Sequence, residues 1–305
     1  MLAWQRFVSI FNMTKQQQLN FANQDLRNRS FKGRNLQGAD FSGADLRGCN
    51  FSRALLIDAN LERVQTGQTR RQLAVLVALA LVVGLLVGDA VSRLIFAALG
   101  QTAEKAGWNF VLALYASLGI AGIGIGLKTL VKPRSLLAKM AGVVSATASG
   151  TLVGFFYGGT MGGQLFAILQ QDSPGENNPQ TAIVGAVFLG LLMAVSSFKA
   201  RNGIVPVIVA TAGTVTAYGF AFLIGTTAIA LLTTSHWFWG SVLGTVSVLY
   251  LWITLKALAL IVQAIKQSWG TSFRKANLTN ARFDGAKLEN TEFREAIAAK
   301  KPIDP

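Results

Sequence analysis

The chain has 305 residues, of which 51% are hydrophobic and only 14% are charged, and its mean hydropathy is +0.43. These values are typical of a protein with several membrane spans. The formal net charge is +14. A basic total can indicate nucleic-acid binding, but basic loops beside membrane spans explain it better, so we expect no nucleic-acid partner.

The first 18 residues have the spacing of an amphipathic helix. Trp4, Phe7, Val8 and Phe11 stand at i, i+3, i+4 and i+7. We expect residues 1–18 to form a helix that caps the segment after it, and a helix lying on the membrane surface is the alternative. The segment lacks the layout and cleavage site of a signal peptide.

A five-residue period runs through both ends of the chain and is absent from its middle. Each unit opens with Phe or Leu, in a first block over residues 19–65 and a second block over residues 271–295. Helical faces recur every 3.6 residues and strand faces every 2, so a chain that turns a square corner every five residues explains the period better. The large residues that we expect in the core are Phe31, Leu36, Phe41, Leu46, Phe51, Leu56, Leu61, Phe273, Leu278, Phe283 and Leu288.

A small residue stands two positions before most of the large ones, as at Ala44, and we expect it to point inward as well. Cys49 occupies one of these slots, which predicts a packing role. Asn or Asp stands between the small and large residues, as at Asp45, and favours turns. Arg29 and Arg34 break the small-residue pattern. Because arginine is not buried without a partner, the first coil is predicted to be open, distorted or terminal.

This pattern, A(D/N)LxX, resembles that of the pentapeptide-repeat family. The resemblance implies a right-handed quadrilateral β-helix, with about two coils from the first block and one from the second. A solenoid needs about three stacked repeats, so we expect the blocks to stack on one another. In the simpler order, the unit of Phe273 follows that of Leu61 and the residues between are an insertion. Pairing between two protomers is the alternative. The resemblance also implies a cyanobacterial thylakoid or plasma membrane.

Residues 72–265 are expected to form a six-helix transmembrane domain, followed by the second block and by a tail over residues 296–305. The connections at residues 128–139 and 199–202 are basic, whereas the one at 171–180 is acidic. Short basic loops stay cytoplasmic, so both termini and both blocks are predicted to be cytoplasmic. The expected spans, each near or above ~20 residues, are 72–91, 108–127, 138–168, 181–198, 204–231 and 237–258.

Glycines stand four residues apart in the third span, at Gly150, Gly154, Gly158 and Gly162. Such stripes let helix backbones approach closely, so we expect tight helix packing. A homo-oligomer face and a groove for a flat ligand, such as a lipid or pigment, are the alternatives.

Candidate catalytic groups are scarce in this sequence. His236, its single histidine, stands in an aromatic run at the end of a span, where interfacial residues gather. Asp89 and Arg93 are four apart and can pair on one helix face. We find no metal-ligand spacing, no phosphate-binding glycine loop and no nucleophile with its base. We therefore expect no enzyme, no catalytic residue, no metal and no cofactor.

The predicted function is a non-enzymatic membrane scaffold. A cytoplasmic β-helix would be presented to a membrane-protein or cytoplasmic partner, for the assembly, localisation or stabilisation of a membrane complex, a photosynthetic one for example. The alternative is a channel or carrier for a neutral or lipophilic solute, with the β-helix as its regulatory domain. A continuous polar cavity between the third and fifth spans would favour that alternative.

Overall fold

The computed structural model describes residues 19–99, 108–131, 135–170, 179–199, 203–268 and 270–298. The chain divides into two compact units, one formed by Met1–Ala74 with Ser268–Pro305 and the other by Val75–Gln267. The second unit is therefore an insertion into the first along the chain. The helix expected at residues 1–18 and most of the expected tail lie outside the described residues.

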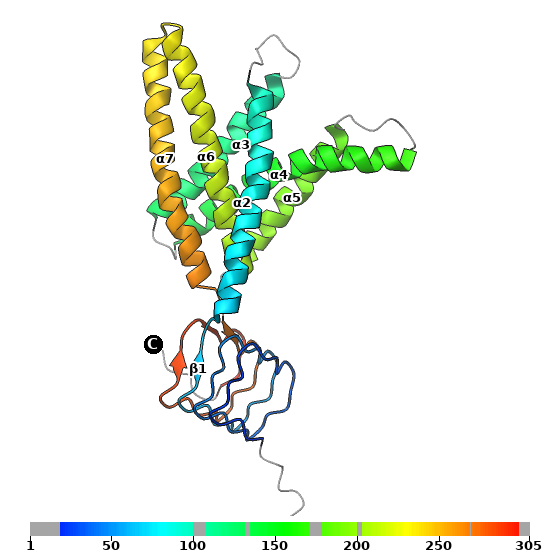
Figure 1. The fold of residues 1–305 in the computed structure, drawn as a ribbon, viewed down its shortest axis with the longest axis vertical. Coiled ribbons are helices and arrows are strands. Elements are labelled where there is room, and N and C mark those ends of the chain that lie inside the picture. Colours follow the sequence, from blue (N-terminus) through cyan, green and yellow to red (C-terminus); the bar gives the residue numbers. More distant parts are fainter. Residues whose placement is uncertain are drawn as a thin grey trace, which may run out of the picture. The chain divides into compact units, whose positions relative to one another are not determined.

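In the first unit, parallel backbone bridges join residues that are twenty apart, such as Asn20 with Asp40 and Asp40 with Asn60. The same ladder continues across the insertion, because Asn50 pairs with Ser272 and Asn60 pairs with Arg282. The two blocks thus form one set of stacked coils within a single chain, here called the repeat stack. In Figure 1 its blue first block and its orange-to-red second block run through the same stack.

Two short strand pairs lie where the blocks meet. β1 (Gln65–Thr66) pairs with β3 (Lys287–Leu288), and β2 (Thr271–Ser272) pairs with β4 (Thr291–Glu292). The sequence predicted that the unit of Phe273 follows the unit of Leu61 directly, but the register places one more unit between them. Ser272 pairs with Asn50, which puts Phe273 one coil beyond Phe51. The position between Leu61 and Phe273 is taken by a unit centred on Thr66.

Among the residues that the structure describes between the blocks, six helices follow one another. Each is long and apolar enough to cross a membrane. Several are longer than the expected spans; α2, for example, has 29 residues, or about 44 Å at 1.5 Å per residue, against ~30 Å of hydrocarbon. The helices are α2 (Arg70–Ala98), α3 (Trp108–Leu130), α4 (Leu136–Gln170), α5 (Pro179–Lys199), α6 (Ile204–Thr233) and α7 (Trp237–Lys266).

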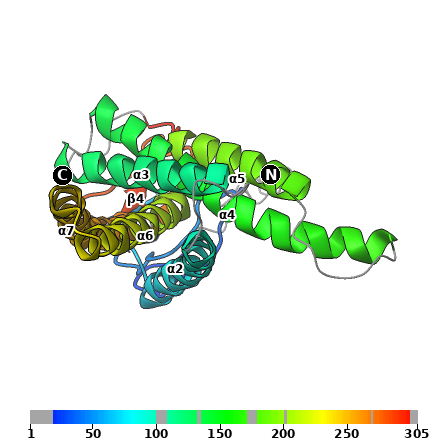
Figure 2. The ribbon, with the colours of Figure 1, turned by 90° about the horizontal axis from the view of Figure 1, so that it is seen from above.

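Within the second unit, α4 packs along α5, α6 packs along α7, and α3 touches both pairs. In Figure 2, α6 lies between α7, α3 and α2, and it is the most buried of the helices. Leu76 near the start of α2 and Ile265 near the end of α7 share one buried cluster with Val207 of α6. The chain therefore enters and leaves the second unit at the same place.

Candidate functional site

The corners of the repeat stack are four-residue turns. At Phe41–Ala44 the N–H of Ala44 donates to the carbonyl of Phe41 at 2.9 Å, and Gly43 has φ of 68°. A positive φ at the third residue is the mark of a type II turn and favours Gly or Asn. Asp40 lies in the bridge before the turn, and its Oδ1 accepts the N–H of Ser42 at 2.9 Å. The Asn and Asp residues at the position of Asp40 thus support the turns from the preceding position, whereas others, such as Asn28 and Asp58, have positive φ and form turns themselves.

The large residues stack into columns along the coils. Phe31, Phe51, Phe273 and Phe293 form one column with ring centroids 5.0, 4.9 and 5.3 Å apart and nearly parallel planes. This column passes from the first block into the second, so the core is continuous across the insertion. Among the expected core residues, exposure is at most 3% for Leu36, Phe41, Leu46, Phe51, Leu56, Leu61, Phe273 and Leu278, whereas Phe31, Phe283 and Leu288 are partly buried.

The small slots are also buried, with Cys49 at 1% exposure. Burial raises the pKa of its thiol to about 12, so the sulfur is a packing group and not a nucleophile at neutral pH. Val64 occupies a small slot and is fully buried, although the sequence did not single it out. Arg29 and Arg34 are exposed on the first described coil. Among the described residues that coil is terminal, which explains how it tolerates arginine in these slots.

The family model described as Pentapeptide repeats matches residues 35–65 and 269–297, in eight copies. These segments of both blocks are pentapeptide repeats. Pentapeptide repeats imply a β-helix, and the match falls on the regular coils of the stack. The comparisons with curated proteins and with solved structures gave no match.

The chain leaves the repeat stack for the inserted helical unit, and returns from it, at a single corner, here called the seam. Gly67 supplies one residue of this corner and Gly270 supplies the next. The carbonyl of Gly67 accepts the N–H of Gly48 from one neighbouring coil at 2.9 Å, and the N–H of Gly270 donates to the carbonyl of Asn290 in the other at 2.9 Å. A Cβ on Gly270 would overlap the backbone of Gly67. Only glycine fits where the outgoing and returning chains meet, and this contact joins residues about 200 positions apart in sequence.

Helix α2 begins directly beside the seam. Thr69 and Gln72 form a capping box, in which each side chain accepts the other residue's backbone N–H, at 3.2 and 3.1 Å. Gln72 Nε2 also donates to the carbonyl of Gly270 at 3.3 Å, and Thr69 Oγ1 donates to Asn28 Oδ1 at 2.9 Å. The T-x-x-Q pattern before an apolar run was a readable signal for this helix start, and the seam adds to it a bond to the returning chain.

Threonine hydroxyls replace apolar groups inside the seam. Thr66 occupies a central slot and bonds to the carbonyl of Lys287 at 3.0 Å and to the hydroxyl of Thr291 at 2.6 Å. Thr271 donates to the carbonyl of Leu46 at 2.8 Å and accepts from the N–H of Gly67 at 3.1 Å. Interrupting the corner removes its ordinary backbone bonds, and buried polar groups must be satisfied. The hydroxyls meet that need.

One outer face of the pentapeptide stack carries a ladder of charges. Arg27 pairs with Asp25 at 2.5 Å and with Asp45 at 3.7 Å, and Arg47 pairs with Asp45 at 2.6 Å. The side-chain hydrogen bond from Arg27 lowers the pKa of Asp25 to about 2. The bond from Arg47 likewise lowers the pKa of Asp45. Both carboxylates therefore stay ionised over the physiological range, and the ladder joins two successive coils.

A neighbouring face is predominantly basic and is here called the basic face. Glu295 pairs with Lys275 at 3.1 Å, and this bond lowers the pKa of Glu295. Among the described residues, Lys32 and Arg53 have no carboxylate within ion-pair distance. The register that aligns Ser30, Asn50, Ser272 and Glu292 places five cations together on this face, namely Lys32, Arg53, Arg274, Lys275 and Arg294.

The glycine stripe of α4 lies against α5. A Cβ on Gly150 would come within 2.8 Å of the carbonyl of Leu189, and one on Gly158 within 2.7 Å of that of Thr181. A Cβ on Gly154 would overlap the backbone of Gly185, and one on Gly162 would come within 2.6 Å of Thr181 Cβ. The stripe is thus occupied by a helix of the same chain.

The remaining polar residues singled out in the sequence lie apart from one another. Asp89 pairs with Arg93 at 2.8 Å and accepts from the hydroxyl of Tyr157 at 3.3 Å, which ties α2 to α4. His236 is exposed just before α7. Within the described part of the chain, no three His, Cys, Asp or Glu side chains gather as metal ligands would.

Proposed function

We propose that this chain is a non-enzymatic membrane scaffold, in which six helices anchor a pentapeptide stack that binds a protein partner. The observation that carries the proposal is the seam. Two blocks separated by the entire helical unit complete one stack, so the platform is whole only when the chain returns from the helices. Such an arrangement suits a surface that must be held at a membrane.

The free-energy cost of bringing the two blocks together supports this proposal. Bringing together the ends of a flexible loop of about 200 residues costs about 5 kcal/mol, from (3/2)RT ln n. The inserted unit avoids much of this cost, since Leu76 and Ile265 already lie in one buried cluster. A folded bundle therefore presents the two chain ends that the seam needs, and an unfolded bundle would withdraw them.

We infer that the stack is a right-handed quadrilateral β-helix whose basic face contacts the partner. Flat faces with side chains at a regular spacing of about 4.8 Å between coils suit an extended contact. Lys32 and Arg53 are exposed, and their charges favour a partner with a complementary acidic surface. Since the stack holds both termini of the described chain, the same proposal puts both on the cytoplasmic side of a plasma or thylakoid membrane. The basic connections at residues 128–139 and 199–202 support that side.

The carrier alternative finds less support in the buried hydroxyls between α4 and α6. Thr211 and Thr214 donate to carbonyls of their own helix at 2.8 and 2.7 Å. Ser149 and Thr216 bond to each other at 3.1 Å. The first two bonds lie within α6, whereas the bond between Ser149 and Thr216 joins α4 to α6. These four hydroxyls are therefore not free to replace the hydration of a solute.

Tagged full-length chain, purified from its native membranes in mild detergent and analysed by quantitative mass spectrometry, tests the scaffold. We expect a protein partner at near-stoichiometric amounts. The double variant Arg53→Glu, Lys275→Glu should lose it, whereas Arg282→Glu, an exposed charge reversal outside the basic face, should retain it. Recovery of the chain alone would contradict the scaffold. Retention of the partner by the double variant would contradict the role of the basic face.

A further inference from the structure

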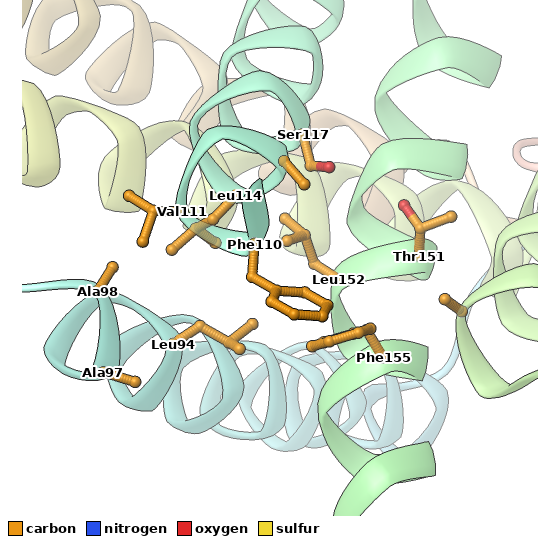
Figure 3. A pocket seen from close by; sticks show the side chains of 12 residues that line it. Leu94, Ala97, Ala98, Phe110, Val111, Leu114, Ser117, Thr151, Leu152 and Phe155 are labelled. Carbon is orange, nitrogen blue, oxygen red and sulfur yellow. The ribbon is translucent and has the colours of Figure 1, made fainter. Parts of the chain in front are cut away.

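The helical unit contains an apolar pocket of about 370 Å³ between α2, α3 and α4, with one residue from α5. Figure 3 shows the rings of Phe110 and Phe155 inside it, with centroids 6.1 Å apart. Leu94 of α2, Leu114 of α3 and Leu152 of α4 complete the apolar walls. Clefts of this size with such walls are the usual form of a small-molecule site.

The pocket follows from the way α2 packs. Val91 and Ile95 of α2 share a buried cluster with Leu118 of α3 and Leu223 of α6, which holds α2 against α6. Helices α4 and α5 lean away from α2 in Figure 1, so space opens between α2 and α4. Phe110 lines this space and is 57% exposed, so the pocket communicates with the outer surface of the helices.

The lining excludes polar occupants. Ser117 and Thr151 carry its two side-chain hydroxyls. Thr151 already donates to the carbonyls of Thr147 and Ala148, at 3.1 and 2.8 Å. A polar or charged molecule entering the pocket would lose its hydration for very few hydrogen bonds, at a cost of several kcal/mol. The occupant must therefore be largely hydrocarbon.

We propose that the pocket binds the acyl chain of a membrane lipid. The helices that form its walls are each long and apolar enough to cross a membrane. This inference rests on the membrane anchoring proposed above, which would put lipid at the mouth beside Phe110. Taking about 30 Å³ for each small heavy group, as for one water in the liquid, the volume holds roughly a dozen chain carbons. From Phe110 to Ser117 the pocket extends about 10 Å along α3 at 1.5 Å per residue, which suits a chain inserted from one leaflet.

Binding the chain would also close the gap between α2 and the α4–α5 pair. A ligand that binds only the folded bundle stabilises it in proportion to the logarithm of its concentration over Kd. The bound lipid would thus act as a component of the helical unit.

The test uses the full chain in phosphatidylcholine vesicles that contain a trace of phospholipid with a diazirine in its acyl chain. After irradiation, we expect the adducts to concentrate in the pocket segments of α3 and α4. The variant Ala113→Trp places an indole in the pocket, because Ala113 is a lining residue, and should lower these adducts at least fivefold. Leu112→Trp, at the exposed neighbouring residue outside the lining, should leave them unchanged.

Even labelling of all exposed helix faces would overturn the proposal, as would pocket labelling that persists in Ala113→Trp. Displacement of the probe by an unlabelled isoprenoid alcohol but not by excess phospholipid would overturn the assignment to an acyl chain. If Ala113→Trp does not fold, Ala97→Phe tests the same pocket from α2 and must give the same loss. These readouts do not involve a protein partner, so they stand or fall separately from the scaffold.

Discussion

Replacing Phe273 by alanine should break the contact between the two blocks. Its ring is fully buried and stacks on Phe51 at 4.9 Å and on Phe293 at 5.3 Å. Removing a buried phenylalanine costs about 3–5 kcal/mol, and each stacked pair contributes about 0.5–1.5 kcal/mol beyond burial. Because a measured truncation cost already includes the lost stacking, we take the middle of the first range and expect Phe273→Ala to lower the free energy of opening of the stack by about 4 kcal/mol.

Cys49 reports this opening in the intact chain. It is the single cysteine of the sequence, it is 1% exposed, and its carbonyl accepts the N–H of Ser272 from the second block at 3.0 Å. A maleimide at pH 8 labels it only when the stack opens. Since 1.4 kcal/mol is about a factor of ten, the labelling rate should rise roughly 700-fold in detergent.

Phe293→Ala is the control for the same column. Phe293 is partly buried and stacks on Phe273 alone within it, so its loss should raise the labelling rate much less. A rate for Phe273→Ala within threefold of the unmodified chain would refute the reasoning. It would mean that the first block stays closed without a tight contact to the second, and that the seam couples nothing.

Three further predictions concern other parts of the structure. Burial raises the pKa of the Cys49 thiol from 9.0 to about 12 in the folded stack, so the free energy of unfolding should fall as pH rises above about 9. Cys49→Ala should remove that part of the fall, measured as the denaturant midpoint at each pH. Gly270→Ala should lower the free energy of unfolding by about 1–3 kcal/mol, because its Cβ overlaps the backbone of Gly67. Gly38→Asn, at a turn with open space, should be nearly neutral. Equal unfolding midpoints for the two variants would contradict the close contact at the seam. Gly154→Leu should push α5 away from α4 and lower the melting temperature in detergent, and an unchanged value would count against close packing.

Much of the repeat stack could be predicted because its inward slots recur at a fixed spacing. Phe41, Leu46 and Phe51 stand at that spacing, and each is fully buried. The same spacing predicted that the coil of Arg29 and Arg34 is open, distorted or terminal, and among the described residues it is terminal. The six apolar helices were equally readable, since length and hydropathy are local properties of the sequence.

The seam and the pocket could not be read in this way. Gly67 and Gly270 look like ordinary loop glycines until a contact across about 200 residues brings them together. Thr66 has no large apolar side chain, so the period hid the unit that it occupies. The pocket depends on the angle between α2 and α4, which no periodicity encodes. Local patterns predicted the elements, whereas long-range contacts determine how they close.

The seam also has a consequence for how the chain is made. A ribosome adds about 5–20 residues per second, so the roughly 200 residues between the blocks take about 10–40 s to synthesise. During that interval the first block exists without the coil that pairs with Asn50, Leu55 and Asn60. An unpaired strand edge invites pairing with other chains. In every newly made molecule this edge therefore stays unpaired until the second block has been synthesised and has joined the first.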